Sequence, residues 1–242
     1  MAFFKRNKKK ETTAENLPMV LTAKDGTPWL TFKGDLAHNL RHMITRLMRK
    51  EPLPTRIALT SALREEGVTY LSLALATAIA SNNLNQKVCL VELNWWWPGM
   101  SQYLGDHDSL GVAAIINQQA KLQDVLIQTG LPNLVLLPAG SLPIEQRPVM
   151  ARNTALKKLI DFLNERYDHV LLDIPAILAS SDAIALASLA KHCCLIIRQG
   201  VTSVENVKLA LDDIDHMKMM GVIMNQVEVK TPSLMLKFIP QE

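Results

Sequence analysis

Short apolar runs alternate with longer stretches of helical spacing through most of this chain. The runs that predict β-strands are residues 56–61, 87–93, 134–139, 169–174, 193–198 and 221–227. The stretches that predict helices between them are residues 69–83, 154–167, 181–190 and 203–220. Several of these strands are apolar throughout, which suits strands that are covered on both faces. The alternation predicts an α/β fold with a doubly wound, mainly parallel sheet and helices on both faces.

The two ends of the chain are predicted to lie outside this sheet. Residues 1–34 are polar and interrupted by prolines and glycines, so they are expected to form a flexible basic tail. Apolar residues at helical spacing then predict a helix over residues 35–50, with Asp35 as its N-cap. We expect a single domain over residues 35–230 and a C-terminal tail over residues 231–242.

Composition narrows the class of protein without identifying a partner. The chain has 242 residues, is 48% hydrophobic and carries a formal net charge of +3, so it is long enough for one sizeable core. The three cysteines lie in apolar runs without metal-ligand spacing, as buried cysteines of a reducing compartment do. No apolar stretch approaches the roughly 20 residues that span a bilayer. We expect a cytoplasmic protein.

The basic residues gather near the N-terminus, just after Phe3 and Phe4. An unstructured solvated tail is one interpretation, and attraction to an anionic membrane surface is the other. The second would place the protein peripherally at the inner face of the cell membrane. The residues concerned are Lys5, Arg6, Lys8, Lys9 and Lys10.

In a parallel sheet ligands bind at the carboxyl ends of the strands, and the first strand ends in "TSALREEGVTY". A phosphate-binding loop reads G-x-x-x-x-G-K-[ST], where glycines let the backbone wrap the phosphates and the lysine neutralises their charge. With Gly67 as the second glycine, Val68 stands at the lysine position and Thr69 at the magnesium position. Glu65 and Glu66 place two carboxylates where a polyphosphate would lie. Taken alone, this stretch is either a decayed phosphate loop or a simple strand-to-helix turn.

Two other strand ends carry candidate chemistry. "VELNWWWPGM" contains Trp95, Trp96 and Trp97, of which at least one is expected to be exposed as an interaction surface, although core packing is the alternative. "LLDIPAILASSDA" places Asp173 at the end of an apolar strand, the general form of a Walker B carboxylate that acts on Mg²⁺.

Together these strand ends resemble the bacterial tyrosine kinases (BY-kinases) of capsule and exopolysaccharide systems, which are relatives of the Min/Par deviant-Walker ATPases. The matching segments occur in the family's order across residues 60–227. They are "TSALREEGVTY", "CLVELNWWWPGM", "SLGVAAII", "LPAGSLPIEQRP", "YDHVLLDIPAILASSDA" and "GVIMNQV". The resemblance implies a P-loop NTPase-like, three-layer α/β/α fold.

Position by position, the resemblance implies a degenerate nucleotide site. Thr69 and Asp173 match the magnesium-linked positions, and Asn225 matches a position that often contacts the adenine. Val68 replaces the phosphate-binding lysine and Glu65 replaces a loop glycine. Glu92 and Asn94 stand where the second Walker motif has two aspartates, and Trp96 and Trp97 replace its paired arginines.

Two further family features are absent. The oligomerisation motif E-x-x-R-x-x-R aligns with His38, Arg41 and Ile44, of which only Arg41 fits. The C-terminal tyrosine cluster that these kinases phosphorylate is missing from "KTPSLMLKFIPQE".

These losses predict a catalytically inactive, kinase-like scaffold or regulator of polysaccharide synthesis or export, with no cofactor. Its partners would be a membrane polysaccharide co-polymerase or chain-length protein, another copy of the chain or a catalytic paralogue. One alternative is an ATPase or kinase that uses ATP and Mg²⁺ with a lysine from elsewhere. Another is a Min/Par-like positioning protein; no nucleic-acid partner is expected in the leading interpretation.

Overall fold

The computed structural model describes residues 17–49, 51–105 and 110–227. Its strands are β1 Met19–Thr22, β2 Pro28–Phe32, β3 Arg56–Ser61, β4 Val88–Glu92, β5 Ile127–Gln128, β6 Leu134–Leu137, β7 His169–Asp173, β8 His192–Arg198 and β9 Lys218–Asn225. Its helices are α1 Gly34–Met48, α2 Val68–Asn82, α3 Met100–Leu104, α4 Val112–Ile116, α5 Leu122–Val125, α6 Arg147–Ala151, α7 Thr154–Asn164, α8 Asp182–Ala187 and α9 Val204–Asp213, with short 3-10 turns η2 Ile144–Gln146 and η3 Ile177–Ala179.

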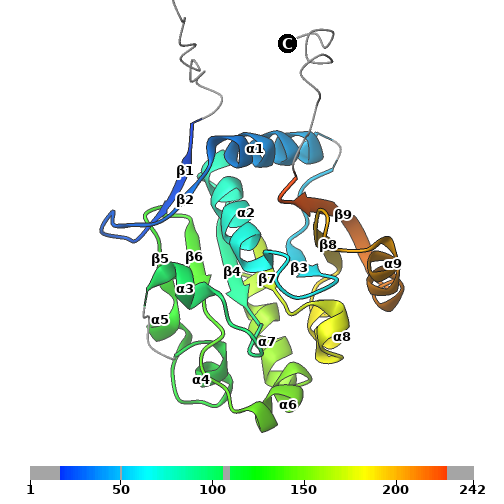
Figure 1. Cartoon of the computed structure of the whole chain (residues 1–242). Helices are drawn as coiled ribbons and strands as arrows, with labels where there is room; N and C mark the ends of the chain where they lie inside the picture. The colour runs from blue at the N-terminus through cyan, green and yellow to red at the C-terminus, as the bar shows by residue number, and fades with distance from the viewer. Residues whose placement is uncertain (1–16, 50, 106–109, 228–242) are drawn as a thin grey trace, which may run out of the picture.

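The main sheet has seven strands in the order β5-β6-β4-β7-β3-β8-β9 (Figure 1). All neighbouring pairs are parallel except β5 with β6. One hydrophobic core lies between the sheet and α1, α2 and the β1–β2 hairpin, and a second lies between the sheet and α4, α7, α8 and α9. The predicted three-layer α/β/α fold is therefore confirmed.

The alternation of apolar runs located the central strands well because these strands are buried on both faces. Every residue of β4, β6 and β7 is buried. α2 is buried over most of its length, which explains why its sequence is rich in Ala and Leu on all sides. The three cysteines are free and buried, as the sequence predicts.

The prediction that residues 1–34 form a tail is wrong for residues 19–32. These residues form the antiparallel hairpin of β1 and β2, whose side chains Met19, Leu21 and Phe32 are buried against α1 and α2. Asp25 and Gly26 make the turn: Gly26 has a φ of +90°, and the Thr27 N–H donates to Asp25 Oδ1 at 2.9 Å. Glycine and proline here mark a hairpin, not an unfolded segment. Residues 1–16, including the basic cluster, lie outside the described part of the chain.

Two helix boundaries also differ from the prediction. α1 begins at Gly34, so Asp35 lies in its first turn and is not the N-cap; Lys33 holds that position. The segment 203–220 is not one helix, because α9 ends at Asp213 and residues from Lys218 onward belong to β9. The predicted domain end at residue 230 and the tail 231–242 lie beyond the described residues. In the described ranges, no helix combines the length and the apolar character needed to cross a membrane.

Candidate functional site

The loop between β3 and α2, where the sequence predicts a phosphate-binding loop, contains two residues with positive φ. Gly67 precedes the helix with a φ of +89°, and a Cβ at this position would lie 2.4 Å from Asn225 Nδ2. Only glycine avoids both the unfavourable backbone conformation and this contact. Glu65 also has a positive φ, of 64°, in the left-handed region that glycine occupies more easily. The loop therefore keeps a shape made for glycine at a position where the sequence has glutamate.

Glu66 does not lie where the sequence places it. Its side chain is 1% exposed and turns back into the loop, where Oε2 accepts a hydrogen bond from the Leu63 N–H at 3.0 Å. Its Oε1 accepts a hydrogen bond from the Thr202 hydroxyl in the loop after β8. The expectation of two carboxylates in the path of a polyphosphate is therefore wrong for Glu66. Glu65 alone is exposed there.

Asn225, at the end of β9, holds the same loop from the other side. Its Nδ2 donates to the backbone oxygen of Glu66 at 2.8 Å, and its Oδ1 accepts from the Gln226 N–H at 2.9 Å. The amide expected at an adenine edge is thus already engaged in fixing the turn before α2. Sequence reasoning missed Thr202, because nothing in the spacing of "RQGVTS" shows that its hydroxyl reaches a loop so distant in the sequence.

Val68 occupies the lysine position at the first turn of α2. Its side chain is half-buried and packs against the core on the α1–α2 side of the sheet. A lysine there would carry its ammonium group to the phosphates, whereas valine offers the helix only an apolar contact. The N–H groups at the start of α2 remain as a partial positive charge for an anion.

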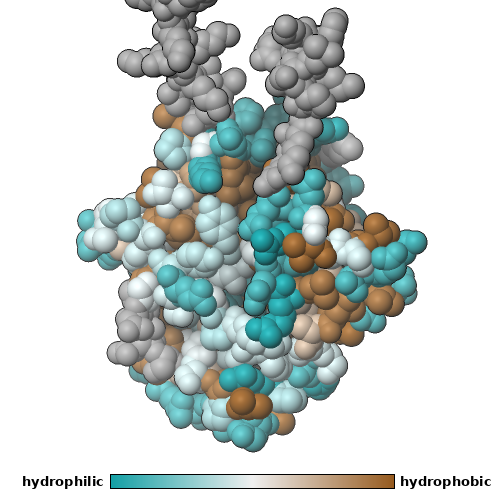
Figure 2. Space-filling model, viewed as in Figure 1, coloured by the Kyte–Doolittle hydropathy of each residue, from teal (hydrophilic) through white to brown (hydrophobic). Residues whose placement is uncertain are grey.

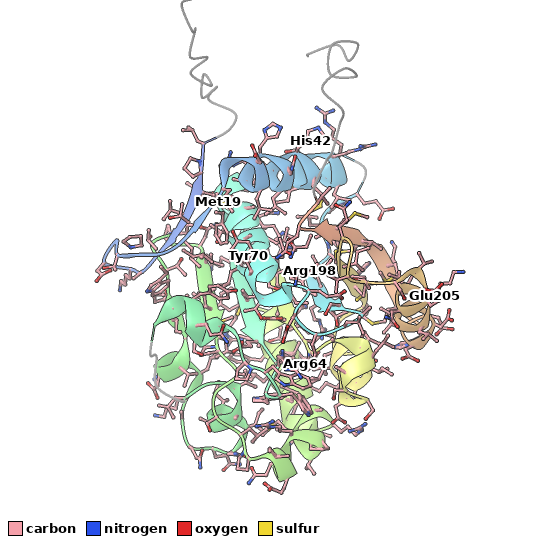
Figure 3. The ribbon with its side chains drawn as sticks, viewed as in Figure 1. Met19, His42, Arg64, Tyr70, Arg198 and Glu205 are labelled. Atoms are coloured by element: carbon pink, nitrogen blue, oxygen red, sulfur yellow. The ribbon has the colours of Figure 1, made fainter. Side chains whose placement is uncertain are left out.

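A cleft of about 420 Å³ lies in front of this helix end. It is lined by Ser61, Arg64, Glu65, Glu66, Gly67, Val68, Thr69, Tyr70, Asn94, Trp97, Gly99, Gln102, Tyr103, Ile174 and Ala176. Arg64, labelled in Figure 3, is the one cationic side chain in this lining. Its guanidinium carbon lies 3.9 Å from the centre of the Trp97 ring. Sequence reasoning missed the Arg64–Trp97 pair, since contact between a loop after β3 and a loop after β4 is set by the sheet order.

Asp173 and Glu92 end the neighbouring strands β7 and β4, where they are paired in register. Glu92 accepts hydrogen bonds from three backbone N–H groups, those of Gly99, Met100 and Ala139. It therefore fixes the loops after β4 and β6, and it does not line the cleft. Burial raises the pKa of Glu92, and the three N–H groups act in the opposite direction.

The Asp173 carboxyl is fully buried, and neither of its oxygens makes a hydrogen bond of normal geometry with a described residue. Burial and the neighbouring Glu92 raise the pKa of Asp173 well above 3.8, whereas the nearby Thr69 hydroxyl acts to lower it. An unpartnered carboxyl beside a threonine hydroxyl fits a Mg²⁺ ion. In the described ranges no three His, Cys, Asp or Glu side chains gather to bind a metal by themselves.

The two halves of the predicted site thus differ. Thr69 and Asp173 lie close together, and their link to magnesium stays a prediction. The phosphate-binding half does not fit a triphosphate, because the lysine is absent and Glu65 adds negative charge to the cleft. Asn94 lines the cleft, with its Oδ1 accepting from the Trp97 N–H at 3.1 Å.

The three tryptophans have different environments. Trp95 is 2% exposed and its Nε1 donates to the backbone oxygen of Ala139 at 2.9 Å, so it belongs to the core and its assignment to an interaction surface is wrong. Trp96 is half-buried against the same core, and Trp97 is half-buried at the cleft. The aligned oligomerisation position Ile44 is also buried, at 1% exposure.

Comparisons with known proteins agree with the fold and the motifs. The chain is 24% identical over 216 residues to the tyrosine-protein kinase Ptk of Acinetobacter johnsonii, covering 86% of this chain but only 29% of that protein. It is 25% identical over 174 residues to the tyrosine-protein kinase CpsD of Streptococcus agalactiae, covering 71% of this chain and 75% of that one.

Among solved structures, the kinase domain of the Escherichia coli tyrosine kinase ETK superposes with a TM-score of 0.72 at 21% identity, covering 80% of this chain and 77% of that one. The septum site-determining protein MinD of Pyrococcus horikoshii, complexed with Mg-ADP, gives 0.59 at 22% identity, with 77% of each chain covered. The resemblance to the tyrosine-kinase and Min/Par P-loop fold is confirmed. The family described as cellulose biosynthesis protein BcsQ matches residues 56–232, and the chain therefore belongs to this family.

Proposed function

We propose that this chain is a non-catalytic P-loop protein that acts through protein contacts as a scaffold or regulator of polysaccharide biosynthesis. The family's description supports cellulose as the polymer concerned. The partners would be a membrane component of the same machinery, a second copy of the chain or a catalytic relative. The protein would work in the cytoplasm, peripherally at the membrane.

The observation that carries this proposal is Val68 at the lysine position, half-buried against the apolar core. Phosphoryl transfer depends on positioning and on neutralising the charge of the transferred group. Removing one preorganised charged group of this kind costs on the order of 3–4 kcal/mol of transition-state stabilisation. The exposed Glu65 carboxylate adds repulsion in the same cleft.

A second candidate is an ATPase or kinase that takes its cation from an unusual place. Arg64 favours it, because this guanidinium lies in the cleft on the loop itself. Two observations weigh against it. Arg64 is held over the Trp97 ring. Lys87 and Lys191, which could supply a lysine from elsewhere in the chain, precede β4 and β8 at the amino ends of these strands. A Min/Par-like positioning role has the fold similarity alone in its favour.

Calorimetry separates the first two candidates. We would titrate the full-length chain with Mg-ATP and with Mg-ADP, and repeat both with the Glu65→Gly/Val68→Lys variant and with Arg64→Ala. No binding by the wild type, with binding gained by the double variant, supports the proposal. Micromolar binding by the wild type that is lost in Arg64→Ala contradicts it and supports the second candidate.

A further inference from the structure

β9 leaves one edge of the main sheet open within the described part of the chain. It is the last strand of the sheet order and pairs with β8. The Asn225 carbonyl accepts a hydrogen bond from the Gln199 N–H at 3.1 Å, so the backbone of Asn225 points towards β8. Backbone groups of successive strand residues point to opposite sides. The N–H and C=O groups of Val222 and Met224 therefore point to the open edge, where a further strand can pair.

The face of β9 on the α9 side is apolar and uncovered. Val222 pairs in register with Leu195 and Met224 with Ile197, two residues of the core on this side of the sheet. Yet Val222 is 48% exposed and Met224 is 53% exposed. Figure 2 shows apolar side chains gathered on the right of the view, in the region of β9 and α9. A patch of this kind at an open strand edge marks a surface that another segment covers.

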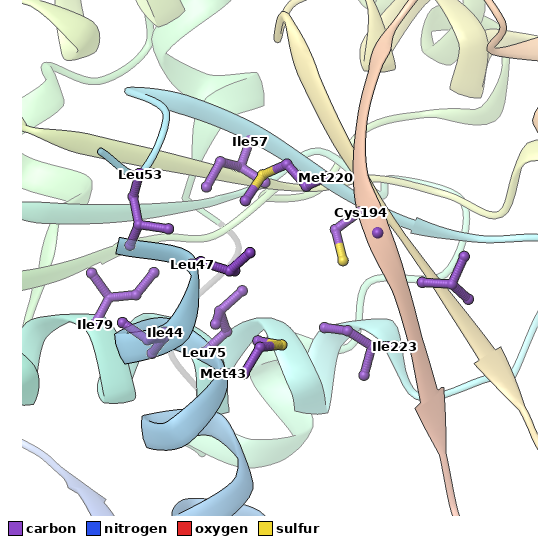
Figure 4. A pocket seen from close by; sticks show the side chains of 12 residues that line it. Met43, Ile44, Leu47, Leu53, Ile57, Leu75, Ile79, Cys194, Met220 and Ile223 are labelled. Carbon is purple, nitrogen blue, oxygen red and sulfur yellow. The ribbon is translucent and has the colours of Figure 1, made fainter. Parts of the chain in front are cut away.

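The opposite face of β9 borders an apolar cavity of about 140 Å³ between this strand, α1 and α2 (Figure 4). Its lining includes Met43 and Leu47 of α1 and Met220 and Ile223 of β9. A strand added to β9 would place alternate side chains on the α9 face and on the cavity face. The edge of β9 can therefore pair with an extended segment whose side chains are mainly apolar on both faces.

We propose that residues 233–239 of this chain dock on β9 as an antiparallel strand. This segment, "SLMLKFI", follows β9 closely in the sequence, is nearly as long as β9 and is apolar apart from Ser233 and Lys237. Pro232 and Pro240 bound it, at positions where prolines end a strand. The linking residues 226–232 contain the charged and turn-forming side chains that suit a hairpin loop.

The end of β9 already has the geometry of a chain reversal. Gln226 has a positive φ of 54°, and its N–H donates to the side chain of the preceding Asn225. The link of residues 226–232 is too short for a parallel strand, which needs a crossover connection of roughly a dozen residues or more. The segment can therefore pair with β9 only in the antiparallel direction.

One register places the fully apolar side of the segment on the α9 face. With Leu236 opposite Val222 and Leu234 opposite Met224, the exposed apolar side chains of β9 gain apolar neighbours on the α9 side. These are also the pairs whose N–H and C=O groups point to one another across the edge. Phe238 follows on this same face, whereas Met235 and Lys237 point to the cavity face. A slip by one residue would turn Lys237 to the exposed α9 face and take Leu234, Leu236 and Phe238 away from it, so the pattern on the α9 side favours this register.

Amide hydrogen exchange, resolved by residue in the full-length chain, tests this docking. The probes are the N–H groups of Val222 and Met224, and the Ile223 N–H, which points to β8, serves as the internal reference. The comparison is between the wild type, Leu236→Asp in the docked strand and Thr231→Asp in the link. The last variant adds the same charge outside the docked strand. We expect exchange at Val222 and Met224 to become roughly tenfold faster in Leu236→Asp and unchanged in Thr231→Asp, with Ile223 unaffected in both.

Three results would overturn the proposal. One is equal exchange at Val222 and Met224 in the wild type and in Leu236→Asp. Another is protection of these amides that grows with protein concentration, which assigns the edge to a second copy of the chain. The third is protection that needs added anionic lipid vesicles, which assigns the segment to a membrane surface. The readout is independent of nucleotide, so it is separate from the test of the proposed function.

Discussion

Glu92 and Asp173 end neighbouring strands side by side, yet all three backbone N–H groups at this point bind Glu92 and none binds Asp173. The Glu92 carboxylate is stabilised by these donors, whereas the Asp173 carboxyl is buried beside it with only the nearby Thr69 hydroxyl to offset its burial. The pair therefore concentrates an unfavourable electrostatic interaction at the carboxyl edge of the sheet, beside Thr69.

The raised pKa of Asp173 predicts a stability that depends on pH. Because the folded pKa lies above the ordinary value of 3.8, the folded state holds its proton more tightly than the unfolded state. The stability contribution is fully present below pH 3.8 and is lost as the pH rises through the folded pKa. We expect Asp173→Asn to be more stable than the wild type at pH 8, by about 1–3 kcal/mol.

Urea unfolding at several values between pH 5 and pH 8 measures this difference. The advantage of Asp173→Asn should grow with pH, and Asp213→Asn, at an exposed carboxylate of α9, should show no such trend. An advantage independent of pH would contradict the assignment of the effect to this carboxyl.

Glu65 is the second place where the loop carries a residue that its backbone does not favour. Its φ of 64° costs roughly 1 kcal/mol for a residue other than glycine. Glu65→Gly removes this cost but makes the unfolded chain more flexible, so we expect a net gain of about 0.5 kcal/mol in the free energy of unfolding. Gly67→Ala should do the reverse and destabilise, because its Cβ would meet Asn225 Nδ2 at 2.4 Å. Parallel urea unfolding curves of the two variants check the opposite signs.

Asn225 fixes the loop before α2 through one hydrogen bond to the Glu66 carbonyl. We expect Asn225→Ala to lower stability by about 1 kcal/mol and to speed amide exchange in residues 63–68. Gln226→Ala, at the next and exposed position, is the matched control. Unchanged exchange in the loop of Asn225→Ala would mean that Glu66 and Thr202 are sufficient to hold it.

The tryptophans should differ sharply in their contribution to stability. Trp95→Ala removes a buried ring and its hydrogen bond to Ala139, with an expected cost of about 3–5 kcal/mol. Trp97→Ala removes a half-buried ring and its stacking with Arg64, with an expected cost of about 1 kcal/mol. Thermal unfolding gives both values. If Trp97→Ala proves as costly as Trp95→Ala, the Trp97 ring is part of the core and not available to a partner.

The fold could be predicted from the sequence largely because its central strands are covered on both faces. Such strands are apolar throughout, and the long helices between them have their own period, so the pattern predicted β3, β4, β6, β7, β8 and β9 and the helices α2, α7, α8 and α9 in order. The short elements between β4 and α7, namely α3 to α6 and β5, were not predicted. The hairpin of β1 and β2 was missed, since Gly26 and Pro28 were interpreted as signs of an unfolded segment. In the structure Met19 and Leu21 alternate with exposed residues along β1 and are buried, and Asp25 and Gly26 form a tight turn. These features produce a hairpin despite the glycine and the proline.

By itself, the sequence determined the α/β class, and it predicted a phosphate loop with Val68 at the lysine position, because these depend on local patterns and on residue identity. The tertiary structure alone decided what the neighbouring side chains do. Glu66 turns into the loop to meet Thr202, Glu92 takes the N–H groups that Asp173 lacks, and Trp95 is buried beside Ala139. The contacts of Glu66 with Thr202, of Trp95 with Ala139 and of Glu92 with Ala139 each join segments at the ends of different strands. The order of strands in the sheet, which sets such neighbours, is not written in any local stretch of the chain.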